Sequence, residues 1–504
     1  MTQAQTRPIR KISFVYTPYG SIKNEPGIKV VKDNYGVFPS LSLAYVAGVA
    51  EHAGYQIQFI DAHALGLSKK ETVRRIKEFD PDLVAYTLTT YLFHQNLEWI
   101  DHIKQATGLP QLVGGVHMGI YPKESFHHSS LDYALTGEAE EALPELLDAI
   151  NNGRDLSQVT GIVYRDEDGN PVVTPPRALF RDVDNAPFPA RHHLPNHLYY
   201  SFISQYRNFT ALITSRGCPF RCIFCEQGGL RFRPRSPENI SDEIDECVHV
   251  HGIKEFDFFD SSFTTQKKRV IKICEEIINR GQHEHIAWAI RSRVDLINEE
   301  MLRYLKEAGC KRIYYGIESG NEEILKTLKK ETTIQRIKEV VRETNKVGID
   351  TFGYFMVGNP GETEETVNET IQLAKEIDLD YAQFSKVTPM PATAMYDMLL
   401  EENGGKDYWR EFVITPKDDL YIPRPKCDMS EEQVQRLARK AYLKFYFRPR
   451  YILFALLRVK SLDELWRSAH TALLMLFQRN QTEEDGTPSG EAAFAAEWDE
   501  RVQY

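Results

Sequence analysis

The chain has 504 residues, of which 42% are hydrophobic, and a formal net charge of -11. This length predicts two to four domains with a sizeable apolar core, and the acidic balance argues against general nucleic-acid binding. Seven cysteines, three of them in one short motif, do not form the pattern of a disulfide framework.

Targeting signals are not evident in the sequence. Residues 1–7 contain no apolar stretch of the kind found in signal peptides. No segment reaches the roughly 18 apolar residues that a membrane span requires. We therefore expect a cytoplasmic protein.

The first part of the chain alternates short apolar runs with helical patterns. Alternation of this kind predicts a parallel sheet with right-handed crossovers. We therefore expect a doubly wound α/β domain over residues 1–160. Its predicted strands lie at 12–16, 55–60, 83–87, 111–115 and 132–135, and its helices at 41–54, 71–79, 96–107 and up to 150.

Small and polar residues follow several of these predicted strands. In doubly wound sheets, ligands bind beyond the carboxyl ends of the strands, and glycine there lets a ligand approach the backbone closely. Ordinary loop residues in a ligand-free sheet would give the same pattern, so both interpretations stay open here. The candidate residues are Thr89, Gly114, Gly115, His117, Gly137 and Glu138.

Residues 161–202 are predicted to form a linker. The segment 166–189 is rich in proline, aspartate and glycine, and it contains a hairpin-like Asp-Glu-Asp-Gly-Asn string. The string Pro187-Phe-Pro-Ala-Arg191 is typical of a proline-rich connector and suggests no chemistry.

A cysteine motif follows the linker. Cys218, Cys222 and Cys225 form a C-x3-C-x2-C array behind an apolar run at 209–214. Three thiolates in one short loop suit iron or zinc. A structural zinc or a closed iron–sulfur site needs four ligands, and the next cysteine, Cys247, lies in a predicted helix. The motif therefore suggests a cubane cluster with one open iron.

The same three cysteines also fit a zinc site or an array of free thiols. A zinc ion could be completed by His249 or His251, or the three thiols could carry no ligand. The rest of the chain favours the cluster, because it repeats a strand–helix unit that builds an active-site barrel.

Strands and helices alternate again after the cysteines, with apolar runs at 255–260, 286–290, 312–316, 352–357 and 380–385. With the run before Cys218, these predict six repeats of a partial β/α barrel over residues 203–425. Active sites of such barrels lie at the carboxyl ends of the strands. The polar residues expected there include Arg291, Arg293, Glu318 and Ser319.

Taken in order, these motifs resemble one enzyme class. The cysteine array, with Phe224 before its last cysteine, resembles the signature of radical S-adenosylmethionine (SAM) enzymes. The strings Asp61-Ala62, Gly114-Gly115-Val116-His117 and Gly137-Glu138 resemble the cobalamin-binding domain of one large class within that superfamily. This class includes the anaerobic magnesium-protoporphyrin ester cyclase and cobalamin-dependent methyltransferases.

The resemblance implies a [4Fe-4S] cluster on the three cysteines, with an open iron that chelates SAM and an electron that cleaves it to a 5′-deoxyadenosyl radical. The SAM ribose diol then needs a carboxylate acceptor, which Glu318 offers. The SAM carboxylate needs a cation, which Arg293 or Arg291 supplies. The other expected SAM contacts are Phe224, Gly228, Gly229 and Ser319.

The resemblance also implies cobalamin on the N-terminal sheet, of the flavodoxin type. The string Asp61-Ala-His63-Ala-Leu-Gly66 matches the D-x-H-x-x-G motif whose histidine ligates cobalt in other cobalamin proteins. That motif normally follows the first strand, and here it follows the second. We therefore expect His63 to be a loop residue. The expected cobalamin contacts are Thr89, Gly114, Gly115, His117, Gly137 and Glu138.

The last part of the chain is expected to be helical from 426 to 480, with a disordered tail at 481–504. Residues 436–479 contain ten Lys and Arg residues against two acids, interleaved with apolar clusters. Such a segment packs on its own barrel or lies on an anionic membrane surface, and the sequence leaves both places open.

The motifs together predict a radical SAM enzyme that abstracts hydrogen from an unactivated carbon, with cobalamin-dependent methyl transfer as the favoured reaction. An oxidoreductase or cyclase that does not methylate is the alternative, and an iron–sulfur electron carrier is a third hypothesis. The expected partners are a small-molecule substrate, lipid-like or planar and apolar, and an electron donor such as flavodoxin or ferredoxin. No nucleic-acid partner is expected.

Overall fold

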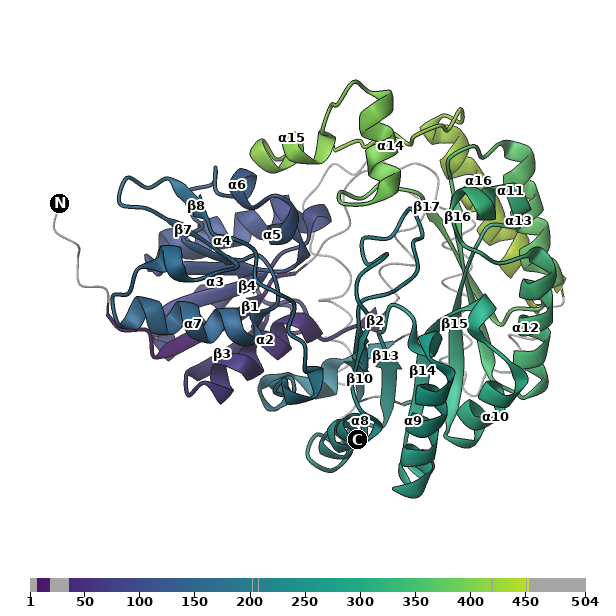
Figure 1. Cartoon of the computed structure of the whole chain (residues 1–504), viewed down its shortest axis with the longest axis horizontal. Helices are drawn as coiled ribbons and strands as arrows, with labels where there is room; N and C mark the ends of the chain where they lie inside the picture. The colour runs from purple at the N-terminus through teal and green to yellow at the C-terminus, as the bar shows by residue number, and fades with distance from the viewer. Residues whose placement is uncertain are drawn as a thin grey trace.

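The computed structural model describes residues 7–18, 36–201, 203–206, 208–417, 420–449 and 451–452. In this part of the chain two α/β bodies lie side by side, each built on a mainly parallel sheet (Figure 1). The arrangement confirms the predicted fold class, a doubly wound N-terminal domain followed by a partial barrel.

The N-terminal sheet runs in the order β3-β1-β4-β5-β6-β7-β8 among the described strands. Strands β3 to β6 are parallel, whereas β7 pairs antiparallel with both β6 and β8. The strands are β1 (Lys11–Tyr16), β3 (Gln56–Asp61), β4 (Leu83–Thr87), β5 (Gln111–Gly114), β6 (Tyr133–Leu135), β7 (Ile162–Arg165) and β8 (Pro171–Val173).

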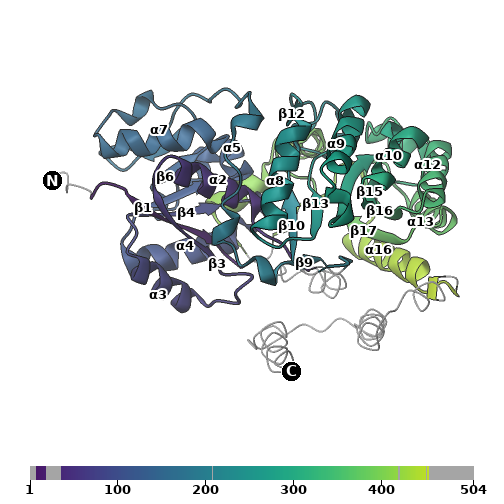
Figure 2. The same cartoon turned by 90° about the horizontal axis from the view of Figure 1, so that it is seen from below.

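Helices cover both faces of this sheet and bury two separate cores. One core lies between the sheet and α2 and α7, and the other lies between the sheet and α3 and α4. Figure 2 shows α7 and the α3–α4 pair on opposite sides of the strands. The helices are α2 (Leu41–His52), α3 (Lys69–Phe79), α4 (Phe93–Thr107), α5 (Val116–Ile120), α6 (Pro122–Ser125) and α7 (Ala139–Asn151).

The sheet continues into the segment that the sequence predicts as a linker. Strands β7 and β8 form an antiparallel hairpin around residues 166–170, where the Asp166 carboxylate accepts hydrogen bonds from the backbone N–H groups of Asp168 and Asn170. These strands are short and lie at the sheet edge, where proline and charged residues are tolerated. The first sheet therefore extends to Val173, beyond the predicted domain boundary at residue 160.

The second sheet is wholly parallel, in the order β10-β13-β14-β15-β16-β17, and its helices lie outside the curve of strands (Figure 1). The strands are β10 (Phe209–Leu212), β13 (Glu255–Phe258), β14 (Ala287–Arg293), β15 (Cys310–Glu318), β16 (Asp350–Val357) and β17 (Tyr381–Lys386). The helices are α8 (Pro237–His249), α9 (Lys267–Asn279), α10 (Glu299–Glu307), α11 (Glu322–Thr327), α12 (Ile334–Lys346), α13 (Glu364–Glu376) and α16 (Glu431–Tyr446).

Two short strand pairs and two further helices complete the described fold. Strand β2 (Gly36–Val37) pairs with β9 (Tyr200–Ser201), and β11 (Ser215–Arg216) pairs with β12 (Arg233–Pro234). Helices α14 (Ala394–Glu402) and α15 (Tyr408–Ile414) leave the barrel and reach the N-terminal domain (Figure 1).

Several contacts join the two bodies. On one side, the Tyr121 hydroxyl donates to the Asp407 carboxylate at 2.9 Å, at the start of α15. On the other, Arg191 of the connector is fully buried and forms an ion pair with Glu243 of α8 at 2.6 Å. The connector therefore holds a buried charge pair, although the sequence suggested no role for it.

The described C-terminal segment packs on the barrel. The Tyr446 hydroxyl at the end of α16 donates to the Ala382 carbonyl of β17 at 2.7 Å. The helix begins with a capping box, in which the side chains of Ser430 and Gln433 each accept a backbone N–H. The basic segment from 453 to 480 and the tail at 481–504 lie outside the described residues. No helix of the described part is long and apolar enough to cross a membrane.

Candidate active site

The cysteine loop is curled by its own backbone hydrogen bonds. The N–H of Cys225 donates to the carbonyl of Cys222 at 3.2 Å, and the N–H of Gly229 donates to the carbonyl of Phe220 at 2.8 Å. A Cβ atom at Gly228 would lie 3.1 Å from the Cys225 carbonyl oxygen and 3.2 Å from that of Phe220. Glycine at 228 therefore lets the loop close on itself.

The three thiols lie near one another and near two cations. Burial raises the pKa of Cys218, the charge of Cys222 adds to the rise, and Arg293 and Lys330 oppose it. Burial likewise raises the pKa of Cys225, to which Cys218 and Cys222 add. A curled loop that carries three thiols fits a cluster that takes three protein ligands.

A fourth protein ligand for the loop is not supported by the described structure. Cys247 is buried in the barrel core, together with Cys274 and Cys310. Helix α8 has 13 residues and is therefore about 20 Å long. It begins at Pro237, on the side of the cysteine loop in the sequence, and His249 is its last residue. His251 lies two residues further on and contacts Glu246. Neither histidine is therefore supported as the fourth ligand of a zinc site on this loop.

Arg293, at the end of β14, lies beside the cysteine loop. Its Nη1 is 3.3 Å from Cys222 Sγ, and its guanidinium lies 4.1 Å from the ring centroid of Phe220. Asp295 pairs with the same guanidinium at 3.0 Å and holds it in place. Arg291 lies two residues before Arg293 on β14, and its guanidinium pairs with Asp257. Of the two arginines that the sequence offered, the structure places Arg293 at the loop.

Glu318, at the end of β15, is buried and pairs with Lys330 at 2.9 Å. Its φ is +66°, a left-handed conformation that is uncommon outside glycine. A Cβ at Gly316 would lie 2.5 Å from Glu318 Oε1 and 2.7 Å from Lys330 Nζ, so glycine there makes room for the pair. Lys330 Nζ also lies 5.8 Å from the ring centroid of Phe224, which brings the pair to the cysteine loop.

Sequence reasoning missed Lys330. The residue stands in a polar Lys-Lys-Glu-Thr-Thr run that looks like solvated surface. In the structure it is only 5% exposed, and its backbone carbonyl accepts a hydrogen bond from Arg293. Lys330 therefore links the two predicted SAM-binding side chains, which come from neighbouring strands.

Ser319 and Phe224 have packing roles in the described structure. Ser319 is fully buried, and its hydroxyl lies 3.3 Å from that of Thr370 on α13 and accepts from the Asn321 N–H. Phe224 packs against a small apolar cluster that includes Ile223 and Leu328. These contacts fix the loop after β15 and the cysteine loop in place, and they leave a SAM contact of either residue as a prediction.

At the strand ends of the N-terminal sheet, two of the predicted cobalamin contacts, Gly115 and His117, pack against other residues of the domain. His117 is fully buried, and its ring nitrogens lie 3.0 Å from the Thr90 hydroxyl and 2.9 Å from the Ser125 hydroxyl. Burial lowers its pKa to about 3. A Cβ on Gly115, whose φ is +101°, would lie 2.5 Å from the Leu88 carbonyl oxygen. Both residues are therefore explained by packing within the loop.

Glu138 joins the two domains. Its carboxylate pairs with Arg216 at 3.0 Å and with Arg233 at 2.8 Å, from β11 and β12 of the second body. It also accepts from the Phe180 N–H at 2.7 Å. Burial opposes ionisation, but the hydrogen bonds and charges of the two arginines outweigh it and lower the pKa of Glu138. This network supports an interdomain role for Glu138.

Thr89 and Gly137 are the predicted cobalamin contacts with free space around them. Thr89 is exposed at the end of β4, and a Cβ on Gly137 would meet no atom within 4 Å. Gly114 is nearly as open, with only Leu135 Cβ at 3.9 Å from an added Cβ. An open edge of this kind fits a bound nucleotide tail, which needs backbone access.

The Asp61-Ala62-His63 segment stands at the end of β3, beside the end of the first strand: Asp61 pairs in register with Tyr16, and the Ala62 N–H donates to the Tyr16 carbonyl at 2.9 Å. Asp61 is fully buried and accepts from the Tyr199 hydroxyl at 2.7 Å and from the Ala64 N–H at 2.8 Å. Burial raises the pKa of Asp61 to about 6 and lowers that of His63 to about 4. The segment thus ties the sheet to the connector, and His63 remains a predicted loop residue.

Comparison with known proteins agrees with this arrangement. Residues 212–374 match the family model of the radical SAM superfamily, and residues 28–147 match that of the B12 binding domain. An uncharacterized methyltransferase of Pyrococcus horikoshii is 34% identical over 88% of this chain and 94% of its own length. An anaerobic magnesium-protoporphyrin IX monomethyl ester cyclase of Cereibacter sphaeroides is 30% identical over 82% of this chain and 68% of its own.

Solved structures share the fold over most of the chain. The radical SAM methyltransferase TsrM from Kitasatospora setae, with cobalamin and a [4Fe-4S] cluster bound, superposes with a TM-score of 0.66 at 19% identity. The match covers 93% of this chain and 99% of that one. The cobalamin-dependent radical enzyme OxsB, with aqua-cobalamin and SAM bound, gives a TM-score of 0.63 at 20% identity, over 93% of this chain and 72% of that one.

Proposed function

Because the chain belongs to the radical SAM enzymes that carry a B12-binding domain, we propose that it is a cobalamin-dependent methyltransferase acting on an unactivated carbon of a small apolar substrate. The observation that carries this proposal is the meeting of Arg293 and the Glu318–Lys330 pair beside the cysteine loop. A methyltransferase relative that is 34% identical over 88% of the chain supports methylation as the outcome.

The cofactors supply the reactive chemistry: when bound, the cluster delivers the electron that cleaves SAM, and cobalamin delivers the methyl group. Cys218, Cys222 and Cys225 would hold the cluster, because they are the described thiols that share one loop. Thr89, Gly114 and Gly137 would hold cobalamin, since their surroundings are open.

The side chains around the loop do the work of binding and orientation. Glu318 offers carboxylate oxygens that accept hydrogen bonds from a ribose diol, and Lys330 supplies the opposite charge 2.9 Å from that buried carboxylate. Arg293 presents a positive charge next to Cys222 for a carboxylate, and Asp295 fixes the orientation of that charge. None of these four side chains is itself a reacting group.

A row of aromatic side chains in the barrel offers a surface for an apolar substrate. The Arg291 guanidinium lies 3.6 Å from the ring centroid of Phe259 and 4.9 Å from that of Tyr314. Tyr354 stacks on Tyr314 with 5.9 Å between centroids and 13° between planes. Phe259 is 39% exposed, whereas Tyr314 is only 3% exposed, so the group is open to solvent at Phe259. This surface supports a planar or lipid-like apolar substrate.

The same surface lies next to the SAM residues. Arg291 precedes Arg293 by two positions on β14, so both side chains point to the same face of the sheet. Tyr314 lies beside Arg291 in the register of β15, and the Glu318 carboxylate lies over Gly316, where an added Cβ would be 2.5 Å from Oε1. A substrate bound to the aromatic side chains would therefore lie next to the expected SAM site, two residues further from the carboxyl end of β14.

A cyclase or oxidoreductase is the second candidate. The relative from Cereibacter sphaeroides is a cyclase, 30% identical over 82% of the chain. Such an enzyme would use the same SAM residues without transferring a methyl group. An electron carrier is the least supported hypothesis, because Glu318 and Lys330 would have no purpose in it. In either enzyme the reducing electron would come from a partner such as flavodoxin or ferredoxin, and peripheral membrane contact through the basic C-terminal region stays a proposal.

Product analysis of SAM separates these candidates. The reconstituted protein is incubated anaerobically with SAM and a reductant, with and without cobalamin. A methyltransferase gives 5′-deoxyadenosine through the cluster and S-adenosylhomocysteine only when cobalamin is present, since loss of the SAM methyl group leaves that product. Formation of 5′-deoxyadenosine without S-adenosylhomocysteine would favour the cyclase, and formation of neither product would contradict both enzyme proposals.

A further inference from the structure

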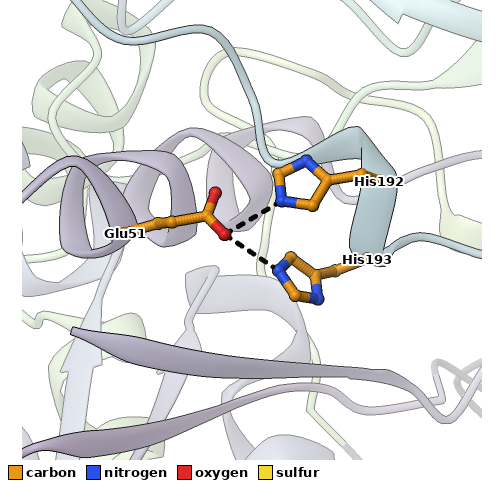
Figure 3. Close-up of side chains that lie close together, drawn as sticks. All are labelled: Glu51, His192 and His193. Carbon is orange, nitrogen blue, oxygen red and sulfur yellow. Dashed lines mark hydrogen bonds and ion pairs between the residues drawn. The ribbon is translucent and has the colours of Figure 1, made fainter. Parts of the chain in front are cut away.

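A second group of potential metal ligands lies outside the cysteine loop, where the connector meets α2. The side chains of Glu51, His192 and His193 converge there (Figure 3). The Nε2 atoms of His192 and His193 lie 2.9 Å and 3.1 Å from the same oxygen, Oε1 of Glu51. The two histidines are neighbours in sequence, yet both rings point to one carboxylate, with their centroids 4.3 Å apart.

We propose that Glu51, His192 and His193 form a binding site for a divalent transition-metal ion, with Zn²⁺ as its simplest occupant. Two imidazole nitrogens and one carboxylate oxygen are a donor set that zinc accepts, with solvent completing the coordination. In a tetrahedral site with bonds of about 2.0–2.2 Å, donor atoms lie about 3.4 Å apart. The present separations of 2.9 Å and 3.1 Å need to widen by only a few tenths of an ångström.

The backbone on both sides of the site is already fixed. The Ala190 N–H donates to the Ala44 carbonyl of α2 at 3.0 Å, and a Cβ on Gly48 would lie 2.3 Å from the Phe188 carbonyl oxygen. The connector therefore lies directly on α2, with glycine allowing the close approach. Because both partners are held before any ion arrives, binding needs side-chain adjustment alone.

The site is open to solvent, so an ion can reach it. The side chains of Glu51, His192 and His193 are 40%, 49% and 29% exposed. Their neighbour Arg191 points the other way, into the buried ion pair with Glu243 of α8. An ion here would link α2 of the N-terminal domain to the connector at the residue that anchors the connector in the barrel. We infer a structural role for the ion, at the junction of the two domains.

Zinc binding by the cluster-loaded protein tests the site. The loaded protein is used because free cluster cysteines would themselves bind zinc. Equilibrium dialysis against Zn²⁺, followed by metal analysis, is carried out on the wild type and on His192→Ala, His193→Ala and Glu51→Gln. His197→Ala is the matched control, since His197 is an exposed histidine on the next turn of the same connector and lies outside the triad.

We expect one zinc per chain in the wild type and in His197→Ala. Loss of either triad histidine should weaken zinc binding about 100-fold or more, because even residues that only support a ligand contribute about 10–100-fold. Zinc should also raise the melting temperature of the wild type and of His197→Ala, but not of the two triad histidine variants. Equal zinc binding in all five proteins, or an equal loss in His197→Ala, would overturn the proposal, and so would a wild type whose melting temperature does not respond to zinc.

Discussion

At the mouth of the barrel the predicted residues come together, whereas at the strand ends of the N-terminal sheet they divide between structural and open positions. Arg293 lies 3.3 Å from Cys222, and Glu318 pairs with a lysine that lies over Phe224. In the N-terminal domain, His117 is enclosed by Thr90 and Ser125, whereas Gly137 faces open space.

The difference follows from what each residue type is needed for. Three thiols at a fixed short spacing have few structural uses, so their pattern in the sequence points to chemistry. Glycines and histidines in loops have many structural uses, such as a positive φ or a satisfied buried hydrogen bond. The barrel motifs are therefore the stronger functional signal, and substitutions in the two regions test that contrast.

The largest expected effect is loss of the cluster. Cys218→Ala, Cys222→Ala or Cys225→Ala should each reduce iron from about four atoms per chain to almost none, because the three-ligand set is broken. Iron analysis after anaerobic reconstitution measures this. Cys310→Ala and Cys427→Ala serve as controls, since Cys310 is buried in the barrel core and neither lies in the cysteine loop. Equal loss of iron in either control would contradict the assignment of three ligands.

Removal of the Glu318 charge is expected to weaken SAM binding and spare the cluster. Glu318→Gln keeps an oxygen that accepts from Lys330, but it loses the charge that strengthens a hydrogen bond to the ribose diol. Such bonds are worth about 1.5–3 kcal/mol, or about 10- to 150-fold in affinity. Titration with SAM measures the change, with Glu323→Gln, exposed on α11, as the control. Unchanged affinity would place the ribose contact elsewhere.

The N-terminal sheet is tested best at Gly137. An added Cβ there meets no atom within 4 Å, so the backbone accepts a side chain, and Gly137→Phe should prevent cobalamin retention while Gly137→Ala retains it. Gly115→Phe is a poorer probe, because its side chain would collide with the Leu88 backbone. The absorption spectrum of the cobalamin-loaded protein reports both occupancy and ligation.

His63→Ala should leave that spectrum unchanged, because His63 follows the second strand and is predicted not to ligate cobalt. A shift in the His63 variant would show that this histidine is a ligand after all. Full cobalamin retention by Gly137→Phe would move the cofactor away from this edge and weaken the comparison between the two regions.

The smallest expected effect concerns pH. The pKa of His117 is about 3 when folded, below its ordinary value of about 6.5. As pH falls below 6.5, the unfolded chain takes up a proton that the folded protein does not, so stability present above that pH is progressively lost. At pH 5 this loss amounts to about 2 kcal/mol. Urea unfolding at pH 7 and pH 5 should therefore show a smaller decline for His117→Gln than for the wild type. An equal decline would mean that His117 is not held neutral by burial.

Much of the fold could be predicted from local patterns. The parallel strands are short apolar runs, and the helices between them have apolar residues at helical spacing, so their order gives the two α/β bodies. The β7–β8 hairpin falls in the predicted linker, because short edge strands with proline and aspartate lack that signal. The connector's Arg191 also gives no signal, since its partner Glu243 is 52 positions away on another helix.

The candidate site divides in the same way. The three cysteines, Arg293 and Glu318 stand in recognisable strings at strand ends, so the sequence finds them. Lys330 stands in a polar run and becomes buried only when β14 and β15 come together. Glu138 stands in a recognisable string, but its arginine partners lie 78 and 95 positions further along the chain. Tertiary partners of this kind leave no trace in a local pattern.

Reductive cleavage of SAM tests the central claim most directly. Anaerobically reconstituted protein that carries about four irons per chain is reduced in the presence of SAM, and 5′-deoxyadenosine is quantified, with Cys222→Ala as the control. We predict that the wild type forms 5′-deoxyadenosine and that the cysteine variant forms none. A fully loaded wild type that leaves SAM intact would contradict the claim that the cysteine loop, Arg293 and the Glu318–Lys330 pair form a SAM-cleaving site.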